Sequence, residues 1–266
     1  MLKIDFYYWS DQCPHNHLNK KLLNSFDDDE RYAITCYDIS DDSGLAKKMN
    51  LFSPTLLVFN DTFRWNGPIK KEQIEAFEKG EIPYRKLYRV DQSDNIVRGL
   101  LKPLDEKTVF DTYQPCARSF GESCCVSKST WIKKIKERYD LRHLGYLHYV
   151  DGECVGGAEF VPSLAVPYNI PKKKDIAFLT CSYLSGENAD YKSHPLEKLE
   201  CHLSEMGYAQ LLTIASEEVV FPNGPLRWFL KRGYTDLGVI SFEQNEGANM
   251  HLLKKTEKYL SYKREL

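Results

Sequence analysis

The first eighty residues alternate between apolar runs and amphipathic stretches. Ile4–Trp9 is an apolar and aromatic run, interrupted only at Asp5, that predicts a strand, and Leu18, Leu22 and Phe26 in the next segment recur at helical spacing. Further strands are expected at 32–38, 55–60 and 62–65, and further helices at 43–49 and 70–79. Strands that alternate with helices favour parallel pairing, and the closely spaced last two strands favour an antiparallel hairpin. The pattern therefore predicts a compact α/β unit.

Gly80 and Pro83 follow the last of these helices and predict a domain boundary. We therefore expect two domains, residues 1–82 and residues 83–266. In the second domain, Leu144–Val150 and Cys154–Val161 flank Asp151-Gly152-Glu153 and predict a tight hairpin. Its other strands are expected at 96–101, 176–183, 211–215, 237–242 and 250–254, and its helices at 105–113, 125–139, 196–206 and 226–232. Both domains are thus expected to be α/β, with mixed sheets.

Charge and composition narrow the possible partners. The chain has 36 Lys and Arg against 38 Asp and Glu, which gives a formal net charge of −2. Such a balance gives no electrostatic reason to expect nucleic acid or an anionic membrane as a partner. Because no apolar run approaches the ~20 residues of a membrane span, and the N-terminus lacks the pattern of a secretory signal, a cytoplasmic location is expected. The eight cysteines should then be mostly reduced.

Cys13 is the first candidate for chemistry. It follows the first predicted strand and opens the first predicted helix. Unpaired N–H groups and partial positive charge at a helix N-terminus favour thiolate over thiol, so Cys13 is a candidate reactive thiol. Ser53, Pro54 and Thr55 lie at the start of the third strand and are expected to pack against Cys13. The alternative is a structural cysteine on a scaffold that is used for docking.

The other cysteines do not predict a metal site. Cys124 and Cys125 are adjacent, which suits chelation poorly, and no Cys-x-x-Cys pair occurs in the chain. No metal is therefore expected. Cys124 and Cys125 open an amphipathic helix, so one of them could be a second low-pKa thiol, whereas Cys36 is expected to be buried in the second strand.

Residues 1–80 resemble a thioredoxin-like domain in the order of their elements, in Cys13 after the first strand and in Ser53-Pro54-Thr55 before the third. Ser10-Asp11-Gln12-Cys13-Pro14 is most similar to the YoaP-like members. The resemblance implies a cis peptide bond before Pro54. Asn16 stands where the family has its second redox cysteine, so a dithiol cycle is not expected, and a monothiol role is left.

Residues 88–256 resemble the GNAT family of N-acetyltransferases. The resemblance rests on the order of elements, on Val155–Pro162 as the strand before the CoA-binding strand, and on Trp228–Tyr234 as the aromatic-rich helix before the sixth strand. It implies acetyl-CoA as cofactor and a small-molecule or peptide amine as acceptor. The residues expected at the cofactor are Leu179, Thr180, Cys181, Ser182, Lys192, Ser193 and His194, and the candidate catalytic groups are Cys13, Glu159 and Tyr183.

Two parts of the family pattern are missing. The family binds the pyrophosphate of acetyl-CoA on backbone amides at a helix N-terminus, through a Gln/Arg-x-x-Gly-x-Gly/Ala motif. Asp190, Ser193 and Pro195 stand at the three motif positions, and Asp190 would face a phosphate with like charge. Phe229 stands four residues before Gly233, where the family often has a tyrosine acid.

Three functions stay open on this basis. The first is an acetyl-CoA-dependent N-acetyltransferase of unknown acceptor, with a monothiol thioredoxin-like accessory domain. The second is a non-catalytic ligand-binding or thiol-sensing protein on an altered GNAT scaffold. The third is a monothiol oxidoreductase that acts through Cys13.

Overall fold

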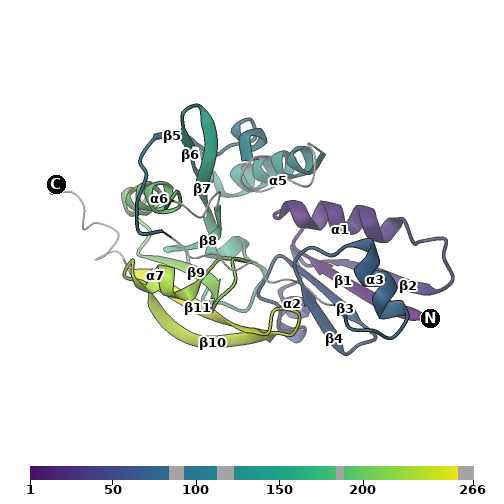
Figure 1. The fold of residues 1–266 in the computed structure, drawn as a ribbon. Helices are drawn as coiled ribbons and strands as arrows, with labels where there is room; N and C mark the ends of the chain where they lie inside the picture. The colour runs from purple at the N-terminus through teal and green to yellow at the C-terminus, as the bar shows by residue number, and fades with distance from the viewer. Residues whose placement is uncertain (84–92, 113–122, 184–188, 257–266) are drawn as a thin grey trace.

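The computed structural model describes residues 1–83, 93–112, 123–183 and 189–256, which form two β-sheets with helices packed on them (Figure 1). Cys116 and residues 184–188 of the segment after the fourth strand of the second sheet lie outside the described residues. Within the described part of the chain, no helix is long and apolar enough to cross a membrane.

The first sheet has four strands in the order β2-β1-β3-β4. Its strands are β1 Leu2–Tyr8, β2 Tyr32–Asp38, β3 Thr55–Phe59 and β4 Phe63–Asn66, and its helices are α1 Pro14–Asn24, α2 Ser43–Lys48 and α3 Lys71–Glu78. β1 and β2 are parallel, and the other pairs are antiparallel. The predicted α/β unit with a late hairpin is therefore confirmed.

Both faces of β1 are buried over most of its length, which explains its largely apolar sequence. Ile4, Phe6 and Tyr8 pack in a cluster with Leu23 of α1 and Phe77 of α3. The alternate residues Tyr7 and Trp9 belong to a second cluster that extends into the other sheet. Cys36, expected to be buried, is exposed. It lies on β2, an edge strand whose middle residues are largely uncovered.

The second sheet has seven strands in the order β10-β11-β9-β8-β7-β6-β5. Its strands are β5 Leu100–Pro103, β6 Gly145–Val150, β7 Glu153–Pro162, β8 Ile176–Tyr183, β9 Gln210–Ser216, β10 Thr235–Glu243 and β11 Ala248–Thr256. Its helices are α5 Ser123–Tyr139, α6 Ser193–Glu205 and α7 Leu226–Leu230, with short 3₁₀ turns η1 Thr108–Thr112 and η2 Ser163–Ala165. Where a helix was expected at 105–113, the chain forms only η1. Among the described pairs of this sheet, β8 and β9 alone are parallel.

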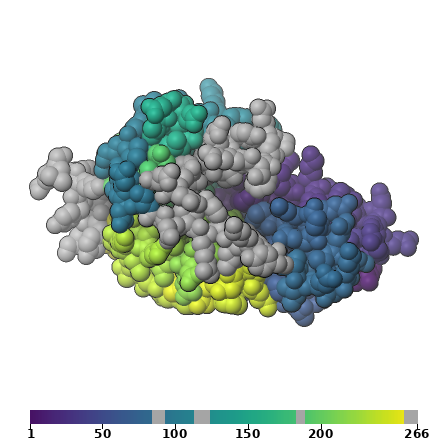
Figure 2. All heavy atoms as spheres, in the orientation of Figure 1, coloured from purple at the N-terminus to yellow at the C-terminus, as the bar shows by residue number. Residues whose placement is uncertain are grey.

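The two sheets share one apolar core. The Trp9 ring meets the edges of Trp131 on α5 and Tyr168 after η2, with centroids 5.9 and 5.5 Å apart. At the other end of the contact, the turn between β10 and β11 reaches the free edge of β4 (Figure 2). There the Asn245 amide accepts from the Asn66 N–H and donates to the Asn66 carbonyl, both at 2.8 Å. The Asn245 amide thus bonds to backbone groups on the outer edge of β4, where the sheet has no further strand.

The pH dependence of stability should report on His143, which stacks on His202 with centroids 4.6 Å apart. Burial, with the neighbouring His202 contributing, lowers the pKa of His143 to about 4. Unfolded histidine titrates near pH 6.5, so the unfolded chain binds more protons between pH 6.5 and 4. Stability should be full above pH 6.5 and fall by roughly 1–2 kcal/mol towards pH 4. Urea unfolding of the wild type and of His143→Gln checks this, since equal losses in both would contradict it.

Candidate functional site where the two sheets meet

A buried ion pair lies at the contact between the sheets. Glu159 on β7 is fully buried, and its carboxylate is 2.8 Å from Nζ of Lys128 on α5. The Thr180 hydroxyl on β8 donates to it at 2.6 Å, and the Gln12 amide after β1 donates at 3.1 Å. Lys128 also donates to the Gln12 carbonyl oxygen. Three donors thus engage the Glu159 carboxylate, and its catalytic role stays a prediction.

Cys13 is the N-cap residue of α1 and lies beside this pair. Its side chain is buried, with Sγ 3.4 Å from Nδ1 of His15. Burial raises the pKa of Cys13 to about 11, against the lowering effects of a hydrogen bond with His15 and the charge of Lys128. Desolvation thus opposes the effect of the helix N-terminus on this thiol, and the reactivity of Cys13 stays a prediction. Cys124 and Cys125 are also buried.

Asn16 and the Ser53–Thr55 segment hold the Cys13 loop in place. The Asn16 amide, at the position of the absent second cysteine, donates to the Ser10 carbonyl at 2.8 Å. The Trp9 N–H donates to the Pro54 carbonyl at 3.0 Å, which joins this segment to the end of β1. Packing of the segment against Cys13 itself stays a prediction. The Thr55 hydroxyl accepts from the Asn19 amide of α1 at 3.1 Å, and the Ser53 hydroxyl donates to the Thr55 carbonyl at 2.8 Å. The implied cis bond before Pro54 is absent, since the cis bonds of the described residues precede Pro222 and Pro225.

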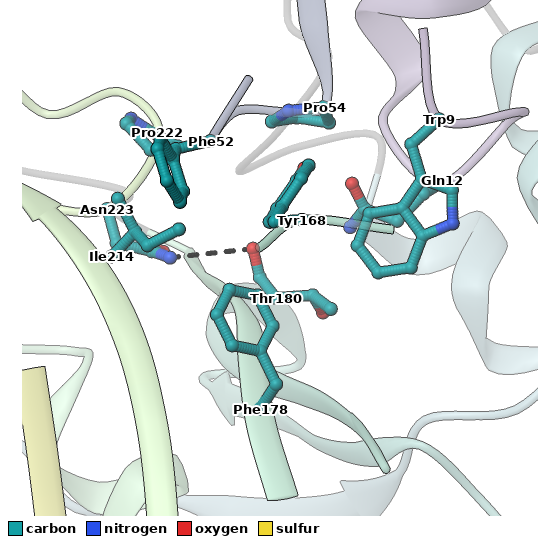
Figure 3. A pocket seen from close by; sticks show the side chains of 10 residues that line it. All are labelled: Trp9, Gln12, Phe52, Pro54, Tyr168, Phe178, Thr180, Ile214, Pro222 and Asn223. Atoms are coloured by element: carbon teal, nitrogen blue, oxygen red, sulfur yellow. Dashed lines mark hydrogen bonds between the residues drawn. The ribbon is translucent and has the colours of Figure 1, made fainter. Parts of the chain in front are cut away.

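A narrow pocket lies between the loop and the second sheet (Figure 3). It is lined by Trp9, Gln12, Phe52, Pro54, Tyr168, Phe178, Thr180, Ile214, Pro222 and Asn223. The free space among these side chains is about that of one water molecule. As it stands, the pocket is too narrow for an acyl acceptor.

The expected cofactor residues of β8 lie where β8 and β9 separate. The two strands pair from Ile176 and Gln210 as far as Leu179 and Thr213. Beyond that point, Asn223 lies between them. Its Oδ1 accepts from the Ser182 N–H at 2.9 Å, and its Nδ2 lies 3.5 Å from the Thr180 carbonyl oxygen. Cys181 is half-buried, and the side chain of Tyr183 lies outside the described residues.

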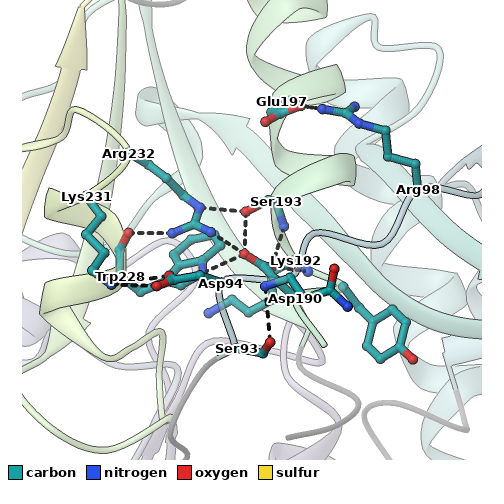
Figure 4. Close-up of polar contacts among 12 residues, drawn as sticks. Ser93, Asp94, Arg98, Asp190, Lys192, Ser193, Glu197, Trp228, Lys231 and Arg232 are labelled. Carbon is teal, nitrogen blue, oxygen red and sulfur yellow. Dashed lines mark hydrogen bonds and ion pairs between the residues drawn. The ribbon is translucent and has the colours of Figure 1, made fainter. Parts of the chain in front are cut away.

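The N-terminus of α6 is occupied by a carboxylate of the same chain (Figure 4). Asp190 is buried, and its Oδ1 accepts from the N–H groups of Lys192 and Ser193 at 3.0 and 2.9 Å. Its Oδ2 accepts from the Ser193 hydroxyl at 2.6 Å and from Trp228 Nε1 at 3.2 Å, and forms an ion pair with Arg232. The groups expected to bind pyrophosphate are thus already bound.

Lys192 and His194 also bond to groups of the same chain. Lys192 is buried, donates to the Gly224 carbonyl at 3.0 Å, and lies 4.3 Å above the Trp228 ring. Burial lowers its pKa to about 7. The His194 ring bonds to the Gly99 carbonyl and to Arg98. Neither residue is placed as an outward phosphate ligand, and the residues at α6 do not fit acetyl-CoA as they are arranged here.

Several residues of this site were not predicted. Lys128 and Asn223 lie in no motif, and Gln12 and Arg232 lie in motifs that gave them no role. Each acts through a partner that is remote in the sequence. The one available signal was Asp190 itself, whose charge was unsuitable for a phosphate site. Within the described residues, no group of His, Cys, Asp and Glu could hold a metal ion.

Comparison with known proteins found no matching family profile and no matching curated protein. Solved structures similar to this chain include an N-acetyltransferase from Staphylococcus aureus Mu50, with a TM-score of 0.43, 9% identity, and coverage of 60% of this chain and 99% of that one. A ribosomal-protein-alanine N-acetyltransferase from Brucella melitensis has a TM-score of 0.41, 13% identity, and coverage of 59% and 99%. An aminoglycoside 6'-N-acetyltransferase complexed with coenzyme A has a TM-score of 0.42, 11% identity, and coverage of 59% and 97%.

Replacing Lys128 by Met should destabilise the protein by about 3–5 kcal/mol, because it leaves Glu159 buried without its cation. Lys133→Met is the matched control on the same helix, since Lys133 pairs with Glu137 in solvent and should cost less than about 1 kcal/mol. Urea unfolding at pH 7 measures both changes. Equal effects of the two substitutions would mean that the buried pair does not anchor the contact.

Cys13 should react slowly with iodoacetamide at pH 7, because its pKa of about 11 leaves little thiolate. Cys36, which is exposed, should be alkylated faster. Peptide mapping by mass spectrometry after timed labelling gives both rates. Preferential labelling of Cys13 would restore the reactive-thiol interpretation.

Proposed function

We propose that the chain is a GNAT-like, acyl-CoA-dependent N-acyltransferase that acts on a small-molecule or peptide amine. What supports this is the arrangement around β8. It is the fourth strand of its sheet along the chain, it leads to α6, and it separates from its parallel neighbour β9 beyond Leu179. The aromatic α7 then precedes β10, the sixth strand. This is the order of elements that the resemblance implies for an acyl thioester beside β8.

Residues 1–82 are proposed to be a thioredoxin-like unit that forms one wall of the acceptor side. The strand order β2-β1-β3-β4, with Cys13 at the start of α1, supports this. Gln12 and Trp9 from this unit line the pocket next to Thr180 of β8. Glu159 is proposed as a positioning residue that orients Thr180 and Gln12. The raised pKa of Cys13 speaks against a monothiol oxidoreductase.

A second candidate is a non-catalytic ligand-binding protein on the same scaffold. The observation that favours it is the buried Asp190 carboxylate at the N-terminus of α6. A protein of this kind would have no need of acetyl-CoA.

Calorimetric titration with acetyl-CoA separates the two candidates. An acyltransferase should give saturable heat and a thermal stabilisation that grows with ligand concentration. Release of the free CoA thiol on addition of an amine panel would then identify the acceptor. The absence of saturable binding at millimolar ligand, both in the wild type and in the Asp190 variant described below, would favour the second candidate.

A further inference from the structure

The donors at the start of α6 form a complete set around one side chain. Two backbone N–H groups, a hydroxyl, an indole N–H and a guanidinium converge on the Asp190 carboxylate. The helix end and Arg232 both favour an anion at this place. Because Asp190 is only 3% exposed and both of its carboxylate oxygens accept hydrogen bonds, the carboxylate fills the position that these donors would offer to an anion. A phosphate that approached would meet a negative charge and no free donor among these groups.

A second group of the same chain lies at the separation of β8 and β9, and it comes from another loop. The Asn223 amide bonds to the Ser182 N–H and lies against the Thr180 carbonyl oxygen, which are the backbone groups beyond the last paired residues. The Ser216 N–H donates to the Asn223 carbonyl at 2.8 Å, which folds this loop back on β9. An extended ligand that used the backbone of β8 would compete with Asn223.

The two occupied positions are physically linked. Lys192, at the start of α6, donates to the carbonyl of Gly224, the neighbour of Asn223. Gly224 packs so tightly that an added Cβ would lie 2.0 Å from the Val219 carbonyl oxygen. The Trp228 ring lies under Lys192 and donates its indole N–H to Asp190. Movement of the Asn223 loop would therefore disturb the α6 end as well.

We infer that the chain closes its own cofactor site, with Asp190 in the place of a diphosphate and Asn223 in the place of the amide-bearing part of an acyl-CoA. This inference rests on the proposed function. It describes an autoinhibitory contact, in which the Asp190 carboxylate must leave the end of α6 before an acyl-CoA binds. Arg232 and the two N–H groups would then be released together.

The test compares acetyl-CoA binding by the wild type, Asp190→Asn and Asp94→Asn, measured by calorimetry. Asparagine keeps the size of Asp190 and its ability to cap the helix but removes its charge. Asp94 is the matched control, because its exposed carboxylate also acts on Arg232 through its charge but pairs with Lys231 instead of with the donors at the start of α6. We expect Asp190→Asn to bind acetyl-CoA at least about tenfold more tightly than the wild type, and Asp94→Asn to bind like the wild type.

Each other outcome is decisive. Equal affinity of the wild type and Asp190→Asn would overturn the closure and leave the proposed function intact. An equal gain in Asp94→Asn would reduce the effect to net charge and would also overturn it. Absence of binding by every variant would overturn the proposed function, and the inference with it. If Asp190→Asn does not fold, as judged by thermal melting, Asn223→Ala replaces it, and an unchanged affinity in that variant overturns the closure.

Discussion

The ion pair between Lys128 and Glu159 is the contact on which the rest of the arrangement depends. A charge removed from water must be paired, so α5 and β7 are fixed relative to each other. Gln12 bonds to both partners, which brings the loop after β1 to the same point. The Trp9 ring then fits between Trp131 and Tyr168 and joins the apolar cores of the two sheets.

The same packing decides the chemistry of Cys13. A thiol at the start of a helix becomes reactive when water and positive charge reach it, and here the thiol is buried beside Lys128 and Glu159. Desolvation raises its pKa, although Lys128 lies near enough to lower it. Cys13 therefore stands at the start of α1, as a reactive thiol would, while its side chain is buried.

The region around β8 combines the layout of a ligand site with an internal occupant. Donors converge at the start of α6 as they would for an anion, but Asp190 satisfies them. Where β8 and β9 separate, the backbone of β8 no longer pairs with β9, but the Asn223 amide hydrogen-bonds to it. The acyltransferase and the non-catalytic candidates differ in one physical respect, which is whether these internal groups can be displaced.

Local pattern was enough to predict most of the elements. The strand over 32–38 and the hairpin around Gly152 follow from periodicity and turn chemistry. Both signals depend only on residues that are close together in the sequence. The apolar run Ile4–Trp9 predicted a strand, and the structure added that both of its faces are buried. The exposure of Cys36, the engagement of Glu159 and the roles of Lys128 and Asn223 were decided by tertiary structure alone. Each depends on which distant segment lies against the residue, and no local period encodes the partner of a buried polar group.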